Sequence, residues 1–342
     1  MRFSLIVARR ELQSKAKGKA RVVVEENIVK NLIIKIMKVK NFVLVIAIMF
    51  MSIQSFAIKP SRTYRFYPEK LGLIYRDLDV KTSDGLKIKT WFFPAQPAPI
   101  NEEELQAILE NPVKKPYQTI DNKRRSTIIF ADSDAGNMSW QQLHHAQYFT
   151  NKGYNVVTFD WRGFGESDEW EMNVDYLVYS ELLIDYDAVI KEVLQQEEVD
   201  TSAIIVSGSS TGAYLSMAAA SKYDNVKAFI ALGLLTTFEE VYPILKKAEK
   251  DPNRDLILPT DYPENLFPLN LAPTWNKATL LIVGELDDRT PVWMSEKIFA
   301  LLPAKKDLWI LEGAEHSGSK GPLRDFDLFH ERVFEFLEKN LE

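Results

Sequence analysis

Cysteine is absent from this 342-residue sequence, and histidine occurs only four times. A chain without cysteine has no thiol nucleophile, no disulfide framework and no cysteine-ligated metal. Its lack of cysteine fits either redox compartment, so the location needs another signal. The four histidines are dispersed, and no metal-ligand spacing appears among them. The sequence therefore implies neither a metal nor a cofactor.

Positive charge is scarce outside the N-terminal region. Residues 1–57 hold 11 Lys and Arg against 3 Asp and Glu, whereas residues 58–342 hold 31 against 45, a net charge of −14. A domain this acidic is a poor partner for a phosphate backbone, so nucleic acid is excluded as a ligand. The length predicts one large α/β domain at residues 58–342, preceded by an extension and a signal peptide.

No apolar run is long enough to span a bilayer. The longest, residues 42–51, has ten residues, and a spanning helix needs about 20. Two lysines precede this run and a Ser-Phe-Ala site ending at Ala57 follows it, which predicts a secretory signal peptide at residues 37–57. We expect translation to start at Met37, cleavage near Ala57, and a periplasmic or secreted product. The alternatives are an uncleaved N-terminal membrane anchor and an ordinary amphipathic helix.

Two patterns of apolar residues follow along the chain. Period-two alternation over residues 78–91 surrounds a Ser-Asp-Gly turn and predicts an antiparallel hairpin. A proline-rich surface insertion with one short helix, 102–110, interrupts the pattern over residues 94–125. From Ser126, apolar strands alternate with longer helical segments, which is typical of βαβ units and a parallel sheet. These strands are expected at residues 127–130, 155–159, 203–206, 228–232, 280–283 and 308–311.

The helices are expected to pack on this sheet through apolar residues at helical spacing. One such helix covers residues 182–194. The last helix is expected to bury Phe326, Phe329, Val333, Phe334 and Leu337.

The longest gap between predicted strands, residues 234–277, separates the sixth strand from the seventh. It opens with a Thr-Thr-Phe-Glu-Glu capping pattern that begins a helix running to about Lys250. An insertion at this point lies over the carboxyl ends of the strands, so we predict a helical cap over the site.

Residues 208–212 read Gly-Ser-Ser-Thr-Gly and join an apolar run, 203–206, to a helix of small residues, 213–221. A Gly-x-Ser-x-Gly turn between a strand and a helix is typical of a nucleophile elbow. Glycines let the two elements approach closely and hold the serine exposed in a strained conformation. We therefore predict Ser210 as the catalytic nucleophile. The other interpretation is a turn that only joins two elements.

A serine hydroxyl is weakly nucleophilic until a neighbouring base takes its proton. His144, His145 and His330 lie in predicted helices and are expected to be surface or half-buried residues. His316 follows the last strand, on a loop at the edge where the elbow also emerges. We predict His316 as the general base.

The acid that orients this base is expected just past the penultimate strand. Asp287 lies three residues after Gly284, and we prefer it to Asp288. The other interpretation of this stretch is a polar loop that caps the next helix. The chain order Ser210, Asp287, His316 is the order of α/β-hydrolases.

Residues 72–342 resemble an α/β-hydrolase, most closely the Bem-like group of serine hydrolases. The resemblance rests on four motifs, at residues 160–167, 208–212, 284–287 and 313–316. It implies an α/β-hydrolase fold with a mostly parallel sheet, helices on both faces and the cap described above. Residues 160–167 match the family's Asp-x-Arg-Gly-x-Gly-x-Ser turn, which we interpret as structural, with Arg162 paired.

One loop departs from the family's pattern. Where the Bem-like group has His-Gly-Asn-Ala-Gly-Asn, residues 132–137 read Asp-Ser-Asp-Ala-Gly-Asn. The resemblance implies an oxyanion hole formed by the backbone N–H groups of Asp134 and Thr211. Both backbone amides are still present, because the loop differs from the family's pattern only in its side chains. The carboxylates of Asp132 and Asp134, on either side of Ser133, are unfavourable near a developing negative charge unless paired or pointed away. Either they hold a cationic or hydroxyl-rich part of the substrate, or activity is impaired.

The leading hypothesis is an exported serine hydrolase, a carboxylesterase or acyl hydrolase that cleaves an ester, thioester or related acyl bond through an acyl-enzyme. The alternatives are a serine peptidase or amidase with the same triad, and an impaired hydrolase-fold binding protein. The expected partner is a small-molecule or lipid-like acyl substrate, without nucleic acid or a stable protein partner. The motifs make the fold assignment specific, but they do not specify the substrate.

Overall fold

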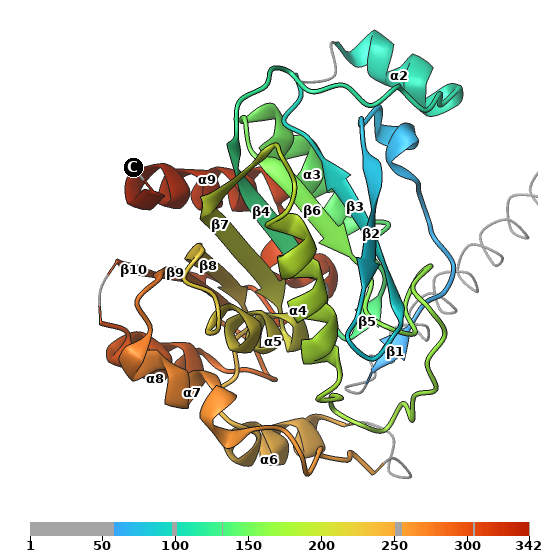
Figure 1. The fold of residues 1–342 in the computed structure, drawn as a ribbon. Coiled ribbons are helices and arrows are strands. Elements are labelled where there is room, and N and C mark those ends of the chain that lie inside the picture. Colours follow the sequence, from blue (N-terminus) through green and yellow to red (C-terminus); the bar gives the residue numbers. More distant parts are fainter. Residues whose placement is uncertain (1–57, 98–100, 132, 250–254, 304, 342) are drawn as a thin grey trace, which may run out of the picture. The chain divides into compact units, whose positions relative to one another are not determined.

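The protein is built around a central sheet of eight strands (Figure 1). The structure, a computed structural model, describes residues 58–97, 101–131, 133–249, 255–303 and 305–341. All of these belong to one compact unit, Ser55–Glu342. The strand order is β10-β9-β8-β7-β4-β6-β3-β2, and only the pairs β2–β3 and β3–β6 are antiparallel. The strands are β2 (Arg76–Lys81), β3 (Lys87–Phe93), β4 (Arg125–Ala131), β6 (Asn155–Phe159), β7 (Val199–Ser209), β8 (Val226–Leu232), β9 (Ala278–Gly284) and β10 (Lys306–Leu311).

Helices cover both faces of the sheet, as predicted. α4 (Leu182–Val193), α5 (Thr211–Ala220) and α8 (Val292–Leu301) share one hydrophobic core, and α3 (Gln141–Asn151) and α9 (Phe326–Leu341) share the other. Strand side chains alternate between these cores. In β8, Phe229 faces the first core and Ile230 the second, because successive residues of a strand point to opposite faces.

The predicted hairpin is confirmed, and the segment predicted as an insertion lies between β3 and β4. β2 and β3 pair antiparallel, with Lys81 opposite Lys87 across the turn. The insertion carries α2 (Glu102–Glu110), which has no buried residue and is N-capped by the Asn101 side chain.

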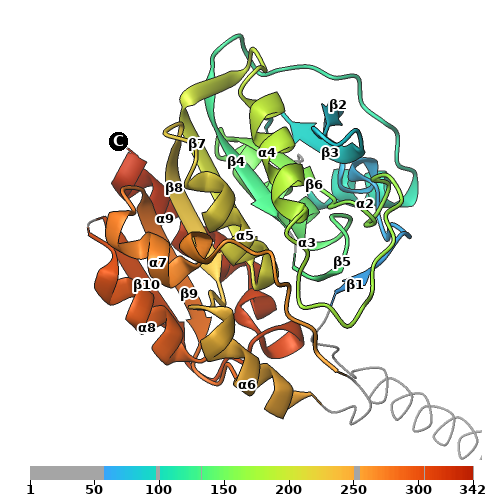
Figure 2. The same ribbon diagram turned by 60° about the horizontal axis from the view of Figure 1, so that its bottom comes forward.

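The insertion after β8 forms the helix predicted there. α6 (Phe238–Ala248) is N-capped by Thr237, whose side chain accepts a hydrogen bond from the Glu240 backbone amide. It is followed by the short α7 (Pro268–Leu271). α6 lies beyond the carboxyl ends of the strands (Figure 2). No helix within the described residues combines the length and apolar character needed to cross a bilayer.

The turn after β6 is structural, as predicted. Arg162 is 1% exposed and forms ion pairs of 2.7 Å with Asp84 and with Asp185. Asp185 lies on α4 and Asp84 in the β2–β3 turn. A buried guanidinium needs such partners, so the arginine joins the hairpin, the turn and α4.

The prediction for the last helix was partly wrong. α9 buries Phe329, Val333 and Leu337, but it also buries Phe336, while Phe326 and Phe334 are only half-buried. The buried face of α9 is centred on residues 329, 333, 336 and 337, and residue 334 lies beside that stripe.

The prediction that His145 and His330 are surface or half-buried was also wrong. Both are buried, 6% and 3% exposed, and His145 Nδ1 lies 2.8 Å from His330 Nε2, between α3 and α9. A hydrogen bond between two imidazoles needs one ring nitrogen to donate and the other to accept, so the two rings are not both protonated. Burial lowers the pKa of His145 well below its ordinary value and the pKa of His330 to about 4.

We expect this pair to make the fold sensitive to acid. The pKa of His330 is about 4 in the folded protein and 6.5 in the unfolded chain. Between these two pH values the unfolded chain binds a proton at His330 and the folded protein does not. His330 alone should therefore remove roughly 3 kcal/mol of stability as pH falls through that window. Urea unfolding at pH 7.5 and 4.5 measures the loss, and His330→Leu should show a shallower pH dependence. Equal slopes in both proteins would contradict this explanation.

Candidate active site

Ser210 lies at the apex of a sharp turn between β7 and α5. Its backbone has φ 51° and ψ −117°, a conformation that is strained for a residue with a Cβ. A Cβ on Gly208 would lie 2.3 Å from the carbonyl oxygen of Gly212, so strand and helix could not meet with a larger residue there. The Ser210 amide donates to the Leu232 carbonyl over 2.8 Å, which anchors the turn to β8.

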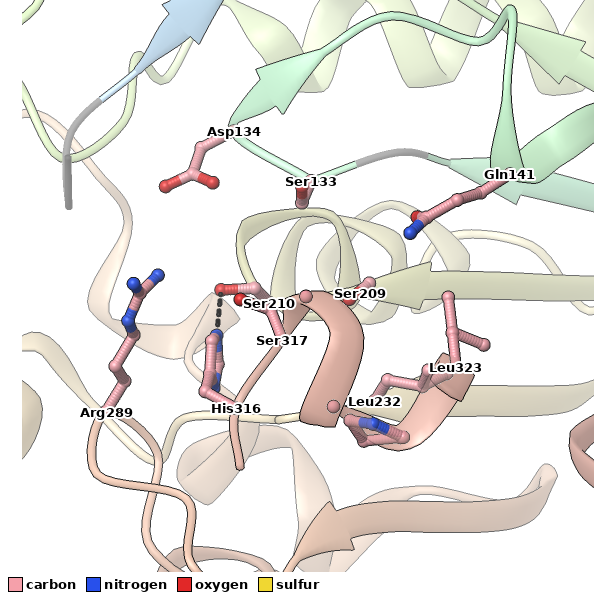
Figure 3. Close-up of a pocket in the computed structure, with 13 residues that line it drawn as sticks. Ser133, Asp134, Gln141, Ser209, Ser210, Leu232, Arg289, His316, Ser317 and Leu323 are labelled. Carbon is pink, nitrogen blue, oxygen red and sulfur yellow. Dashed lines mark hydrogen bonds between the residues drawn. The ribbon is translucent and has the colours of Figure 1, made fainter. Parts of the chain in front are cut away.

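The structure brings the three residues of the predicted triad together. His316 Nε2 lies 3.1 Å from Ser210 Oγ (Figure 3). His316 Nδ1 lies 2.8 Å and 2.9 Å from the two carboxylate oxygens of Asp287. They come from loops after three different strands, β7, β9 and β10, whose carboxyl ends lie at one edge of the sheet. A Cβ on Gly233 would lie 2.9 Å from His316 Cε1, so the imidazole packs against the backbone of Gly233 at a distance that a side chain there would not allow.

Asp287 contacts His316, whereas Asp288 is exposed. The Asp287 carboxylate also accepts hydrogen bonds from the backbone amides of Arg289 and Thr290 and from the Thr290 hydroxyl. Burial by itself would raise the pKa of Asp287, but these donors and His316 together hold that pKa below its ordinary value. Asp287 is therefore an anion oriented toward the histidine.

The loop after β4 lies on the other side of Ser210. Asp134 and Thr211 line one small cavity together with Ser210, so the two residues predicted to supply oxyanion-hole amides flank the serine. Asp132 lies outside the described residues. The segment that follows the predicted cleavage site supports this loop: β1 (Lys59–Pro60) pairs in parallel with β5 (Ala135–Gly136).

Arg289 is a site residue that the sequence analysis missed. It is half-buried and lines the same cavities as Ser210, and Figure 3 shows its guanidinium on the side of the serine where Asp134 lies. Burial lowers the pKa of Arg289, and the nearby carboxylates of Asp134, Asp288 and Asp287 oppose that shift. Arg289 therefore places a positive charge beside a carboxylate that would otherwise oppose a developing oxyanion.

Two cavities meet at Ser210. The first has a volume of about 90 Å³ and includes His316, Ser317 and Leu323 in its wall. The second has about 20 Å³, and its apolar wall comes from Leu177 and Leu235 and, on α6, from Val241 and Leu245. The α6 segment thus covers one side of the serine.

A sequence model of the prolyl oligopeptidase family matches residues 140–342, which include Ser210, Asp287 and His316. This chain belongs to the prolyl oligopeptidase family. It is 24% identical over 264 residues to the uncharacterized protein YfhR of Escherichia coli K12, covering 76% of this chain and 79% of that relative.

Solved structures show the α/β-hydrolase fold. Esterase Pf2001 of Pyrococcus furiosus matches with a TM-score of 0.62 and 20% identity, over 84% of this chain and 98% of the esterase. A puromycin-hydrolyzing peptidase of Mycobacterium tuberculosis matches with a TM-score of 0.56 and 18% identity, over 78% of this chain and 39% of the peptidase. One of these two structural neighbours is named as an esterase and the other as a peptidase.

No group of three or more His, Asp or Glu side chains in the part of the chain that the structure describes is arranged to hold a metal ion. The chemistry available at this site is that of a hydrogen-bonded serine, imidazole and carboxylate, with a cation and backbone amides beside them.

Proposed function

We propose that this protein is an exported serine hydrolase that cleaves an ester, thioester or related acyl bond through an acyl-enzyme. The hydrogen-bonded chain from Ser210 through His316 to Asp287 supports the proposal most strongly. In it, the nucleophile, the base and the group that orients the base are each within reach of the next.

The reaction follows from this geometry. Ser210 Oγ attacks the acyl carbon while His316 Nε2 accepts its proton, and Asp287 holds the imidazole and stabilises its positive charge. The amides of Asp134 and Thr211 would donate to the oxyanion. His316 then gives the proton to the leaving group, and a water molecule activated by His316 hydrolyses the acyl-enzyme. Membership of the Bem-like group stays a prediction.

The two cavities suggest how a substrate lies. The leaving group must reach His316 to receive its proton, and His316 lines the cavity of about 90 Å³ but not the one of about 20 Å³. The smaller cavity is therefore assigned to the acyl group. A cavity of this size holds about one water molecule. We propose that the enzyme prefers acetyl esters to longer acyl chains.

Leu245→Ala should enlarge the acyl cavity and change this preference. Truncation removes three carbons from the cavity wall, so turnover of 4-nitrophenyl hexanoate relative to the acetate should rise about tenfold, a change of about 1.4 kcal/mol. Ile244→Ala on the same helix is the matched control, because Ile244 does not line the cavity. An unchanged ratio in Leu245→Ala would place the acyl chain elsewhere.

A peptidase is the second candidate, because the family is named for an oligopeptidase and a peptidase is among the structural neighbours. A matched pair of 4-nitrophenyl acetate and 4-nitroacetanilide, followed by short peptides, separates the two. Turnover of the ester with slow turnover of amides supports the esterase. Efficient cleavage of peptides would favour the peptidase, and no turnover of any substrate would favour an impaired binding protein.

Export is proposed from the sequence between Met37 and Ala57. This segment lies outside the described residues. When the protein is expressed from Met37 in a bacterium with an export pathway, the exported form should begin at Ile58. N-terminal sequencing tests this, and retention of residues 42–51 would indicate a membrane-anchored protein.

A further inference from the structure

A polar groove adjoins the candidate active site. It has a volume of about 350 Å³, within the range of small-molecule sites, and it shares Ser133 and Gln141 with the cavity that contains His316. Figure 3 shows the Gln141 side chain extending from α3 toward the side of the cavity where Ser133 and Ser209 lie. The groove therefore continues the space assigned above to the leaving group.

Hydroxyl and amide groups dominate the wall of the groove. Six of its residues are neutral and polar, Trp140 adds an indole, and Arg65 adds one cation to the wall. The six include Ser61, Thr63, Ser133, Gln141 and Gln142. Both amide and hydroxyl side chains can donate and accept hydrogen bonds without carrying charge. A ligand with several hydroxyl groups offers the same combination of donors and acceptors.

Gln142 adds a buried amide to the wall of the groove. The residue is 3% exposed, and its Oε1 has no hydrogen-bond partner among the described residues. A buried carbonyl oxygen without a donor costs about 1–3 kcal/mol, so native sites seldom leave one unsatisfied. Gln142 lines the groove, so its side chain is a candidate contact for a ligand bound there.

Trp140 gives the groove an aromatic wall. Its side chain is 39% exposed, and it contacts Phe66, with ring centroids 5.5 Å apart, and His144 edge-on. The Arg65 guanidinium also lies over the ring, 5.8 Å from its centroid. A sugar ring has apolar C–H faces between its hydroxyl groups. Such a ring fits a wall that combines an indole with amides and hydroxyls.

We propose that the groove is a leaving-group subsite for a carbohydrate, so that the substrate is an O-acetylated sugar. The inference rests on the proposed function. Ser210 takes the acetyl group and the sugar hydroxyl departs with the proton from His316. Water then releases acetate and restores Ser210. The net reaction converts an acetyl ester and water into a sugar alcohol and acetic acid.

The test compares sugar acetates with carbocyclic esters that lack hydroxyl groups. The probes are the four mono-O-acetyl isomers of methyl glucopyranoside, with cyclohexyl acetate and cyclohexylmethyl acetate as counterparts, and acetate release is followed by pH-stat titration. We expect at least one sugar ester to exceed its counterpart about tenfold in kcat/KM. Gln141→Met and Gln142→Met should each reduce that ratio at least fivefold, mainly through KM, because methionine keeps the length but removes the amide.

Gln147→Met is the matched control, since Gln147 lies on α3 but does not line the groove. If Gln142→Met fails to fold, the half-buried Gln141 still decides the result. The inference is overturned if cyclohexyl esters are hydrolysed as well as every sugar ester, or if the sugar preference survives in a folded Gln141→Met variant. If the wild-type protein hydrolyses none of these esters and no 4-nitrophenyl acetate, the proposed function is overturned, and the inference with it.

Discussion

Ser210→Ala should lose at least about 10⁴-fold in the hydrolysis of 4-nitrophenyl acetate. The substitution removes the oxygen that lies 3.1 Å from His316 Nε2, and no other hydroxyl in the described site has that contact. Alanine keeps the Cβ and removes one atom. The free energy of unfolding should therefore change by less than about 1 kcal/mol.

The matched control is Ser221→Ala, at the end of the same helix, where the hydroxyl donates to the Ala218 carbonyl. It should turn over the ester at the wild-type rate. Initial-rate measurements on purified proteins, with urea unfolding to verify the fold, make the comparison. If Ser210→Ala retained a tenth of wild-type turnover, Ser210 would not be the nucleophile.

His316→Ala should lose about 10³-fold to 10⁴-fold in kcat, because the serine then has no base and the leaving group no acid. The double variant Ser210→Ala/His316→Ala should be no slower than either single variant, since residues that act as a unit do not contribute additively. His144→Ala is the control. His144 is half-buried on α3, beside Trp140, and makes no contact with the triad.

Kinetics of the single and double variants on the same ester measure this coupling. Additive losses would mean that Ser210 and His316 act independently, contrary to their hydrogen bond. More than a tenth of activity left in His316→Ala would require a different base.

The sheet and its helices could be predicted because their signals are local. Apolar runs and turn residues located each predicted strand, and the threonine before α6 marked the start of that helix. The elbow could be found because Gly208 and Gly212, where strand and helix approach closely, lie only two residues from Ser210 in the sequence. His316 and Asp287 followed from their places after strands whose carboxyl ends share one edge.

Features that depend on distant parts of the chain could not be read in this way. His145 and His330 are 185 residues apart, and only the packing of α3 on α9 joins them into a buried pair. Residues Lys59 and Ala135 pair across an interval that no local pattern marks. Arg289 looked like one more charge in a polar loop, and its role depends on Asp134, from a loop after a different strand.

The surroundings of the Asp134 carboxylate differ from those that the sequence suggested. Asp134 was expected to oppose the oxyanion or to hold part of the substrate, and the structure adds a cation to the same side of the serine. The polar groove beside it agrees with a hydroxyl-rich substrate. Both observations bear on specificity rather than on the triad.

The central claim is that Ser210 forms a covalent bond with the reacting acyl group, and a fluorophosphonate tests it most directly. Such a probe phosphonylates a serine only where a base and an oxyanion site activate it. Intact-mass spectrometry of the treated wild-type protein should show one adduct per chain, and peptide mapping should assign it to Ser210. The adduct should be absent from Ser210→Ala and strongly slowed in His316→Ala. An unmodified wild-type protein, or an adduct at another serine, would contradict the account.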